Sequence, residues 1–234
     1  MKRFGINLNP FLYLNKYMPL SHFSIQHIIS LAELENVDAF SMHYDSKYQL
    51  FTKREALLLN ALSFKFINIH TSSNDHLYKD ILDTKPNMVT FNGGLNETTF
   101  DTFSVRMSDT FEFFETATEW VKKSNILCGV KLLPDVAEIK YASKLQFDYI
   151  EFDLSELNSA SNLDEEQHLL EKLKVAVIAA EKYGFGINIS GLITPENMAQ
   201  FQAICQVEEF YTSKHFFERS LIKGIVQTIH EYKK

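Results

Sequence analysis

Ionisable residues stand at the ends of several short apolar runs in this chain. His43 follows FSM, His70 follows FINI, and Glu151 lies within YIEFD. A neutral imidazole can donate or accept a proton near pH 7, and a carboxylate can stabilise positive charge that develops during a reaction. If these runs are strands of a barrel with alternating helices, their carboxyl ends meet at one mouth. We therefore predict a catalytic group of His43, His70 and Glu151, with Asn7 at the end of GIN beside it.

The acidic residue of the sixth run is placed by the alternation of side chains along a strand. Glu151 shares one strand face with Tyr149 and Asp153, and an ionisable group that faces a barrel interior is costly unless it is paired. Asp153, at the tip of the run, is the alternative candidate. Each histidine could instead close its strand through local hydrogen bonds. A metal held by both histidines and Glu151 is a further alternative, but no His-x-His or His-x3-His spacing supports it.

The segment Thr212-Ser213-Lys214 joins the last run to the last helical segment. Backbone N–H groups at a helix start attract phosphate, and barrels often bind phosphate after strands seven and eight. Ser213 could equally be a simple helix cap. Gly184-Phe185-Gly186 precedes a strand instead of following one, so it is not a dinucleotide-binding loop. We predict neither a metal nor a cofactor.

The elements that position these residues alternate between strand and helix. Apolar runs of four to eight residues predict strands, and segments with helical periodicity follow each of them. The predicted strands are Arg3–Asn9, Ala39–Tyr44, Lys65–His70, Met88–Asn92, Ile126–Leu133, Phe147–Asp153, Gly186–Ile189 and Glu208–Thr212. The predicted helices are Ser24–Asn36, Thr52–Leu62, Asn74–Thr84, Ser108–Lys123, Val136–Lys144, Asp164–Tyr183, Pro195–Cys205 and His215–Tyr232.

This order predicts an α/β fold, a single (β/α)8 TIM barrel that occupies residues 1–234 as one domain. An open doubly wound sheet is the alternative, but eight units of similar size favour closure. Two segments, Phe11–Phe23 and Leu95–Met107, are predicted to be long loops at the mouth, where loops are often functional.

Composition excludes several classes of protein. The 234 residues carry a net charge of −7, which argues against a binder of nucleic acid. No apolar run reaches the roughly 18 residues of a membrane span, and no signal-peptide core follows Met1. Cys128 and Cys205 fit neither a disulfide framework nor a metal site. We therefore expect a cytoplasmic protein without a membrane partner.

Several segments together resemble the pyridoxine 5′-phosphate synthase family. Gly5-Ile6-Asn7-Leu8-Asn9 resembles the opening of that family, and Val37–His43 resembles its second strand. Thr84-Lys85-Pro86 matches a tripeptide before the fourth strand, Phe147–Phe152 resembles the sixth strand, and Arg219 is retained in the last helix. The likeness extends over nearly the whole chain.

The resemblance implies an enzyme that condenses 1-deoxyxylulose 5-phosphate with 3-amino-2-oxopropyl phosphate, with loss of phosphate and water. It implies that His43 is an acid or base, that Glu151 stabilises charge, and that the partners are phosphorylated small molecules. The residues assigned to substrate binding are Asn7, Asn9, Asn188, Ser213 and Lys214. The family forms oligomers, so a homo-oligomer is expected. Aromatic residues that look exposed in the first loop are candidates for that contact: Phe11, Tyr13, Tyr17 and Phe23.

The chain departs from the family at several positions of the site. The arginine and second histidine that follow His43 in the family are Asp45 and Leu50 here, and the glutamate after the third strand is His70. The histidine of the seventh strand is absent from Ser190-Gly191-Leu192. Two alternatives therefore stay open. One is a catalytically silent barrel that acts as a binding or regulatory protein, and the other is an enzyme that acts on another phosphosugar.

Overall fold

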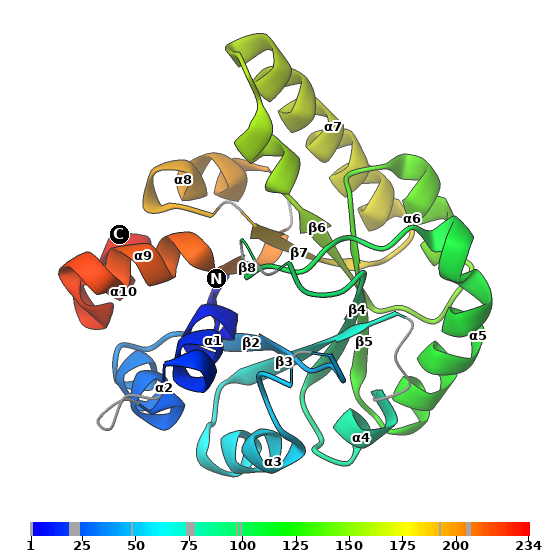
Figure 1. The fold of residues 1–234 in the computed structure, drawn as a ribbon. Coiled ribbons are helices and arrows are strands. Elements are labelled where there is room, and N and C mark those ends of the chain that lie inside the picture. Colours follow the sequence, from blue (N-terminus) through cyan, green and yellow to red (C-terminus); the bar gives the residue numbers. More distant parts are fainter. Residues whose placement is uncertain are drawn as a thin grey trace.

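Eight parallel strands close into a barrel in the computed structural model, which describes residues 2–18, 24–47, 49–73, 78–96, 98, 100–191, 193–204 and 207–234. Each strand pairs with the next along the chain, and β8 pairs with β1 (Figure 1). The strands are β1 (Arg3–Asn7), β2 (Ala39–His43), β3 (Phe66–Ser72), β4 (Met88–Asn92), β5 (Leu127–Leu132), β6 (Tyr149–Asp153), β7 (Gly186–Gly191) and β8 (Val207–Thr212). The predicted TIM barrel is confirmed, and the open sheet is excluded.

Helices surround the barrel and follow the strands in the predicted order. They are α1 (Asn9–Tyr17), α2 (Ile25–Leu34), α3 (Lys53–Leu62), α4 (Tyr78–Leu82), α5 (Met107–Lys123), α6 (Val136–Ala142), the 3-10 turn η1 (Ser155–Ser159), α7 (Leu163–Lys182), α8 (Pro195–Ala203), α9 (Lys214–Lys223) and α10 (Ile225–Tyr232). Ser24, where the first predicted helix begins, caps α2, since its side chain accepts the N–H of His27. Thr52 and Glu55 form a capping box at the start of α3.

Two predicted elements are wrong. The segment after β1 was expected to be a loop from residue 11 onward, but α1 occupies Asn9–Tyr17 because Pro10 suits the first turn of a helix. Phe11 lies on its buried side and is not exposed. The closing helix is divided into α9 and α10 at Gly224, whose φ of 84° does not fit a right-handed helix. Phe23, Cys205 and the first four residues of the third predicted helix, residues 74–77, lie outside the described residues.

The strands separate an apolar layer from a polar interior. Residues such as Phe40, Val130 and Ile189 are fully buried in the hydrophobic core. The alternate strand positions are buried and polar: Asn7, Ser41, His43, Asn68, His70, Thr90, Asn92, Lys131, Glu151, Asp153, Asn188, Ser190 and Glu209. Branched apolar residues usually fill such a barrel. Burying this many polar groups is costly unless they pair, so the interior is built around its hydrogen bonds and charges.

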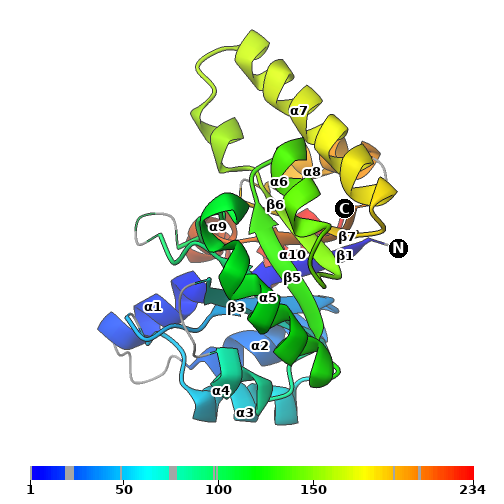
Figure 2. The same cartoon turned by 90° about the vertical axis from the view of Figure 1, so that its right-hand side faces the viewer.

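One helix extends beyond the outline of the barrel. The two views agree that α7, joined to β6 through η1, projects away from the other helices (Figures 1 and 2). Figure 2 also shows that the N-terminus lies at the opposite end of the barrel from the loop that follows β4. Within the described parts of the chain, no helix has both the length and the apolar character of a membrane span.

Candidate active site

His43 ends β2, and its ring is buried between a carboxylate and an amide. Nε2 lies 2.7 Å from Asp45 Oδ2, and Nδ1 lies 3.2 Å from Asn92 Nδ2. Asn92 Oδ1 accepts the Gly94 N–H at 2.8 Å, so the amide group turns its NH2 toward the ring. In the neutral ring Nδ1 is therefore the acceptor, and Nε2 carries the proton and faces Asp45.

His70 and Glu151 meet across the barrel from β3 and β6. His70 Nε2 lies 3.2 Å from Glu151 Oε2, and both side chains are buried. Asn68 Nδ2 also lies 3.2 Å from this nitrogen, and its amide is fixed by the Thr90 hydroxyl, which donates to Asn68 Oδ1. Among the described residues, His70 Nδ1 is buried without a hydrogen-bond partner. A buried nitrogen of this kind, at the site end of a strand, is a group that a substrate can engage.

Lys131, on β5, places its ammonium group near the carboxylates of Glu151 and Asp153 on β6. Its Nζ lies 3.9 Å from Glu151 Oε1 and 3.8 Å from Asp153 Oδ2, and the side chain is buried. Burial lowers the pKa of Lys131, but Asp153, Asp101 and Glu151 together raise it above its ordinary value. Lys131 is therefore a fixed positive charge at neutral pH, not a nucleophilic amine.

Glu151 is ionised at neutral pH in spite of its burial. Burial raises its pKa, but the pair with His70, the charge of Lys131 and a hydrogen bond from Ser190 lower it to about 2. Together these three interactions outweigh the desolvation cost at this position. Glu151 can therefore stabilise positive charge, as expected, but it is not placed to donate a proton.

Asp101 belongs to the loop after β4 and lies over the carboxylates of the barrel. Burial raises its pKa to about 6, with Asp153 raising it further and with Lys131 and a hydrogen bond from Ser213 lowering it. The loop therefore adds a carboxyl group that titrates just below neutral pH. Ser213, the residue before α9, is buried and does not cap that helix.

Asn7 and Asn9 hold the framework around His43. Asn7 Oδ1 accepts the N–H of Asn9 at 2.9 Å. Asn9 Oδ1 accepts the backbone N–H of His43 at 2.7 Å, and its Nδ2 donates to the carbonyl of Phe100 at 3.0 Å. Asn9 therefore ties β2 to the loop after β4. Its contacts are those of a positioning residue.

Asn188 lies inside the barrel, in register with Glu151. Its Nδ2 donates to Glu209 Oε2 at 3.2 Å. Glu209 also accepts the Tyr211 hydroxyl at 2.7 Å and lies 2.8 Å from Arg3 Nε. Asn188 is thus a member of the hydrogen-bond network that fills the barrel.

A cavity of about 380 Å³ lies beside the carboxylates of Asp101 and Asp153. It is lined by Asn96, Asp101, Thr102, Phe103, Asp153, Ser155, Gly191, Lys214, His215 and Glu218. Lys214, predicted to bind phosphate, is half-exposed at the start of α9, and its Nζ lies 3.8 Å from Glu218. The structure therefore places Lys214 and Asp153 on one cavity, whereas Ser213 lies beneath its surface.

The three predicted catalytic residues come together at one end of the barrel. His43 and His70 are register partners on adjacent strands, and His70 contacts Glu151. Within the described residues, no cluster of three or more His, Cys, Asp or Glu side chains is arranged to hold a metal ion.

Sequence reasoning missed three charged residues of this site: Lys131, Asp101 and, as the partner of His43, Asp45. The alternation that placed Glu151 inside the barrel would also have placed Lys131 there, since Gly129 and Lys131 share one face of β5. Asp45 and Asp101 lie in loops, where periodicity carries no signal.

Comparison with known proteins agrees with this fold. Residues 4–234 match the family model described as pyridoxal phosphate biosynthesis protein PdxJ. The pyridoxine 5′-phosphate synthase of Geotalea daltonii is 23% identical over 204 residues, which are 86% of this chain and 84% of that protein. The corresponding protein of Citrifermentans bemidjiense is 24% identical over the same shares of both chains.

Solved structures with the same fold have lower identity. A structure titled KGPDC from Streptococcus mutans superposes with a TM-score of 0.66 and 14% identity, over 100% of this chain and 96% of that one. Phosphoribosyl anthranilate isomerase from Thermotoga maritima has a TM-score of 0.63 and 14% identity, over 100% and 98% of the two chains. These two support the barrel alone. Because the family model covers nearly the whole chain, the protein belongs to the PdxJ family of pyridoxal phosphate biosynthesis proteins.

Proposed function

We propose that this protein condenses 1-deoxyxylulose 5-phosphate with 3-amino-2-oxopropyl phosphate to form pyridoxine 5′-phosphate. The observation that carries the proposal is the convergence of two histidine–carboxylate pairs, His43 with Asp45 and His70 with Glu151, at one barrel mouth. Closing a ring with loss of water and phosphate requires several proton transfers, each of which an oriented imidazole can accelerate by about 10²–10⁴-fold. The family membership supports the same reaction.

The two histidines have different roles in this proposal. His70 exchanges protons with the substrate through Nδ1, the ring nitrogen that has no hydrogen-bond partner in the described structure. The Glu151 carboxylate at its other nitrogen stabilises the charged ring. Asp45 orients His43 through Nε2, and a substrate atom that displaces the Asn92 amide would exchange a proton at Nδ1.

The ammonium group of Lys214 supports the binding of one phosphate beside α9. Lys214 and His215 line the cavity at the start of that helix, where backbone N–H groups also point outward. Asp101 and Asp153 border the same cavity, so a phosphate would lie toward Lys214 and away from these carboxylates.

The open cavity supports an enzyme over a silent barrel. Phe103 is its only aromatic lining residue among those described, and the rest of the lining is mostly polar or charged. A mouth that had lost its function could fill with apolar side chains at little cost, whereas this one retains buried charges that cost free energy to keep.

Complementation of a strain that lacks the synthase tests the proposal. We expect the wild-type chain to restore growth without vitamin B6, and the purified protein to form pyridoxine 5′-phosphate from the two substrates. His43→Ala and His70→Ala are each expected to lower the rate by about 10²–10⁴-fold. His230→Ala, which removes an exposed histidine paired with Glu35, is the matched control. Absence of product beside an active family member would reject the proposed reaction.

A further inference from the structure

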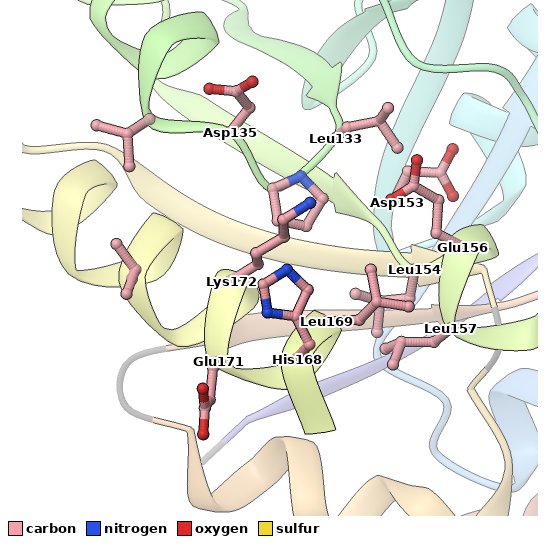
Figure 3. Close-up of a pocket in the computed structure, with 13 residues that line it drawn as sticks. Leu133, Asp135, Asp153, Leu154, Glu156, Leu157, His168, Leu169, Glu171 and Lys172 are labelled. Carbon is pink, nitrogen blue, oxygen red and sulfur yellow. The ribbon is translucent and has the colours of Figure 1, made fainter. Parts of the chain in front are cut away.

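Two histidines outside the predicted catalytic group line cavities that also contain Asp153. His168, on α7, lines a cavity of about 580 Å³ between α6 and α7, which Figure 3 shows together with Asp153. His215, in the first turn of α9, lines the cavity of about 380 Å³ beside that helix. The surroundings of the two imidazoles show which of them is held in place.

The His168 ring is exposed at the edge of its cavity. Among the described residues, neither of its ring nitrogens has a hydrogen-bond partner. The Asp153 carboxylate is already held by the Ser104 hydroxyl at 3.1 Å and by the Ser155 N–H at 3.0 Å. The Lys131 ammonium lies 3.8 Å from the same carboxylate. The described part of this cavity therefore does not fix the ring of His168.

The His215 ring is half-buried, and one of its nitrogens is anchored inside the protein. Nδ1 lies 3.0 Å from the hydroxyl of Tyr232, the last residue of α10. The Tyr232 ring is buried and packs against Phe4 and Phe216, with ring centroids 5.0 and 5.8 Å apart. Burial also raises the pKa of the Tyr232 hydroxyl, which therefore stays protonated. The end of α10 thus fixes the imidazole at the start of α9.

The hydrogen bonds around Tyr232 determine which nitrogen of His215 carries the proton in the neutral ring. The Tyr232 hydroxyl lies 2.9 Å from the carbonyl oxygen of Ile193, and the Thr212 hydroxyl lies 3.1 Å from both of these oxygens. If Tyr232 donates to Ile193, its oxygen can accept from both Thr212 and Nδ1. If Tyr232 donates to Nδ1 instead, one hydrogen bond fewer is made, because each hydroxyl has a single proton. The neutral ring is therefore protonated at Nδ1, and Nε2 keeps its lone pair.

The second nitrogen, Nε2, is the one that remains for the cavity. Among the described residues, Nε2 has no hydrogen-bond partner. Burial and the charge of Arg219 lower the pKa of His215 below its ordinary value of 6.5. The carboxylates of Glu196 and Glu218 raise this pKa, but less. His215 is therefore neutral at pH 7, with a lone pair that can take up a proton.

Three further charged groups face the same cavity: Asp101, Asp153 and Lys214. The Lys214 ammonium can hold an anionic group of a substrate. The two carboxylates can stabilise the imidazolium that forms when Nε2 takes up a proton. The cavity therefore combines a cation for binding with a base for proton transfer.

We propose that His215 is a further catalytic residue of this protein, whose Nε2 accepts a proton from the substrate bound beside α9. This role rests on the proposed function, since ring closure with loss of water needs a base as well as an acid. A C–H or O–H bond of the substrate breaks, its electron pair stays on the substrate, and the ring becomes an imidazolium. The imidazolium then returns the proton to a departing hydroxyl group, which leaves as water. Tyr232 is a positioning residue, because it acts on the substrate only through His215.

Steady-state kinetics of two neighbouring residues tests this role. We expect His215→Gln to lower kcat by about 10²–10⁴-fold and to leave KM nearly unchanged. Lys214→Met should instead raise the KM for the sugar phosphate and leave kcat nearly unchanged. Tyr232→Phe, which removes the acceptor of the Nδ1 proton, should lower kcat by about tenfold. His168→Gln, which removes the exposed histidine of the other cavity, should react at the rate of the wild type.

Nuclear magnetic resonance measures the position of the proton without any reaction. A protonated and an unprotonated imidazole nitrogen differ in 15N chemical shift, and the signals of His215 are those that His215→Gln lacks. At neutral pH we expect Nδ1 to be protonated and Nε2 to be unprotonated in the wild type. In Tyr232→Phe we expect a mixture of the two tautomers, which a merely structural role of Tyr232 would not produce.

Two results would overturn the proposal. One is a neutral His215 ring that carries its proton on Nε2, because that nitrogen could then accept none. The other is an active protein in which His215→Gln lowers kcat no more than His168→Gln does. If the wild type forms no pyridoxine 5′-phosphate, the proposed reaction is rejected, and the spectrum alone decides whether Nε2 is a proton acceptor in this cavity.

Discussion

At the scale of single residues, the Lys131 ammonium compensates the negative charge of the buried Glu151 carboxylate. Glu151 and Asp153 are two positions apart on β6 and face the same interior. Lys131 lies within 4 Å of both, and His70 approaches Glu151 from the other side. Without Lys131, the buried Glu151 would lose one of the partners that keep its pKa low.

We predict that Lys131→Met destabilises the fold by about 3–5 kcal/mol at pH 7, because it leaves buried carboxylates without their partner. In the wild type the pKa of Glu151 is lowered to about 2 from 4.5, so its ionised form stabilises the fold above about pH 4.5. That stabilisation is lost as the pH falls toward 2. The variant has a higher pKa at Glu151 and should lose less stability than the wild type between pH 7 and pH 4.

Urea unfolding at both pH values measures this difference, and Lys174→Met serves as the exposed control on α7. A destabilisation of Lys131→Met that stays constant between pH 7 and pH 4 would contradict the electrostatic explanation. It would indicate that only the packing of the lysine chain matters.

Sequence reasoning identified the titratable groups at strand ends but not how they are paired. His43, His70 and Glu151 could be found because each closes or occupies an apolar run. The partners Asp45 and Asp101 lie in loops, and their positions depend on how those loops fold over the mouth. The tautomer of His43 depends on the Asn92 amide, which a hydrogen bond from Gly94 orients. The spacing of residues along the sequence does not reveal a side-chain contact between two strands of this kind.

At the scale of elements, helix ends with side-chain caps were easier to predict than helices that depend on tertiary packing. Two predicted helices begin at Ser24 and Thr52, and both side chains make cap hydrogen bonds there. The first turn of α1 has no side-chain cap and is instead held by burial of Phe11 and Leu12 against the barrel. Its sequence therefore resembled a loop, although Pro10 is compatible with a helix start.

The break between α9 and α10 leads to a prediction about Gly224. Its φ of 84° and ψ of 155° belong to a region that almost only glycine adopts. A Cβ atom there would meet nothing within 4 Å, so any cost of Gly224→Ala comes from the backbone and not from a clash. We expect a loss of about 1–3 kcal/mol in the free energy of unfolding, measured with urea. Gln227→Ala, on the exposed side of α10, should change the free energy of unfolding little. If Gly224→Ala is as stable as the wild type, the backbone at Gly224 is not strained for other residues.

At the scale of the whole molecule, the closed barrel explains why one end carries all the candidate chemistry. Parallel strands place their carboxyl ends together, and the polar interior continues from Arg3 and Glu209 to His43 and Asp153. Such an interior contributes less hydrophobic stabilisation than a branched apolar filling. The outer layer between strands and helices must therefore supply most of it.

The exposed end of α1 leads to a prediction about assembly. Tyr17 and Met18 are 53% and 60% exposed, and the Tyr17 ring packs on Tyr13, which contacts Phe100 of the loop over the mouth. An apolar cluster beside a functional mouth is a common interface between subunits.

We predict that the 27.1 kDa chain sediments as a dimer or larger oligomer. Tyr17→Arg should lower that mass, because a charged residue at the interface must be desolvated, whereas Tyr141→Arg on the exposed face of α6 should not. A wild-type chain that remains monomeric at micromolar concentration would contradict the prediction, and equal masses for both variants would place the interface elsewhere.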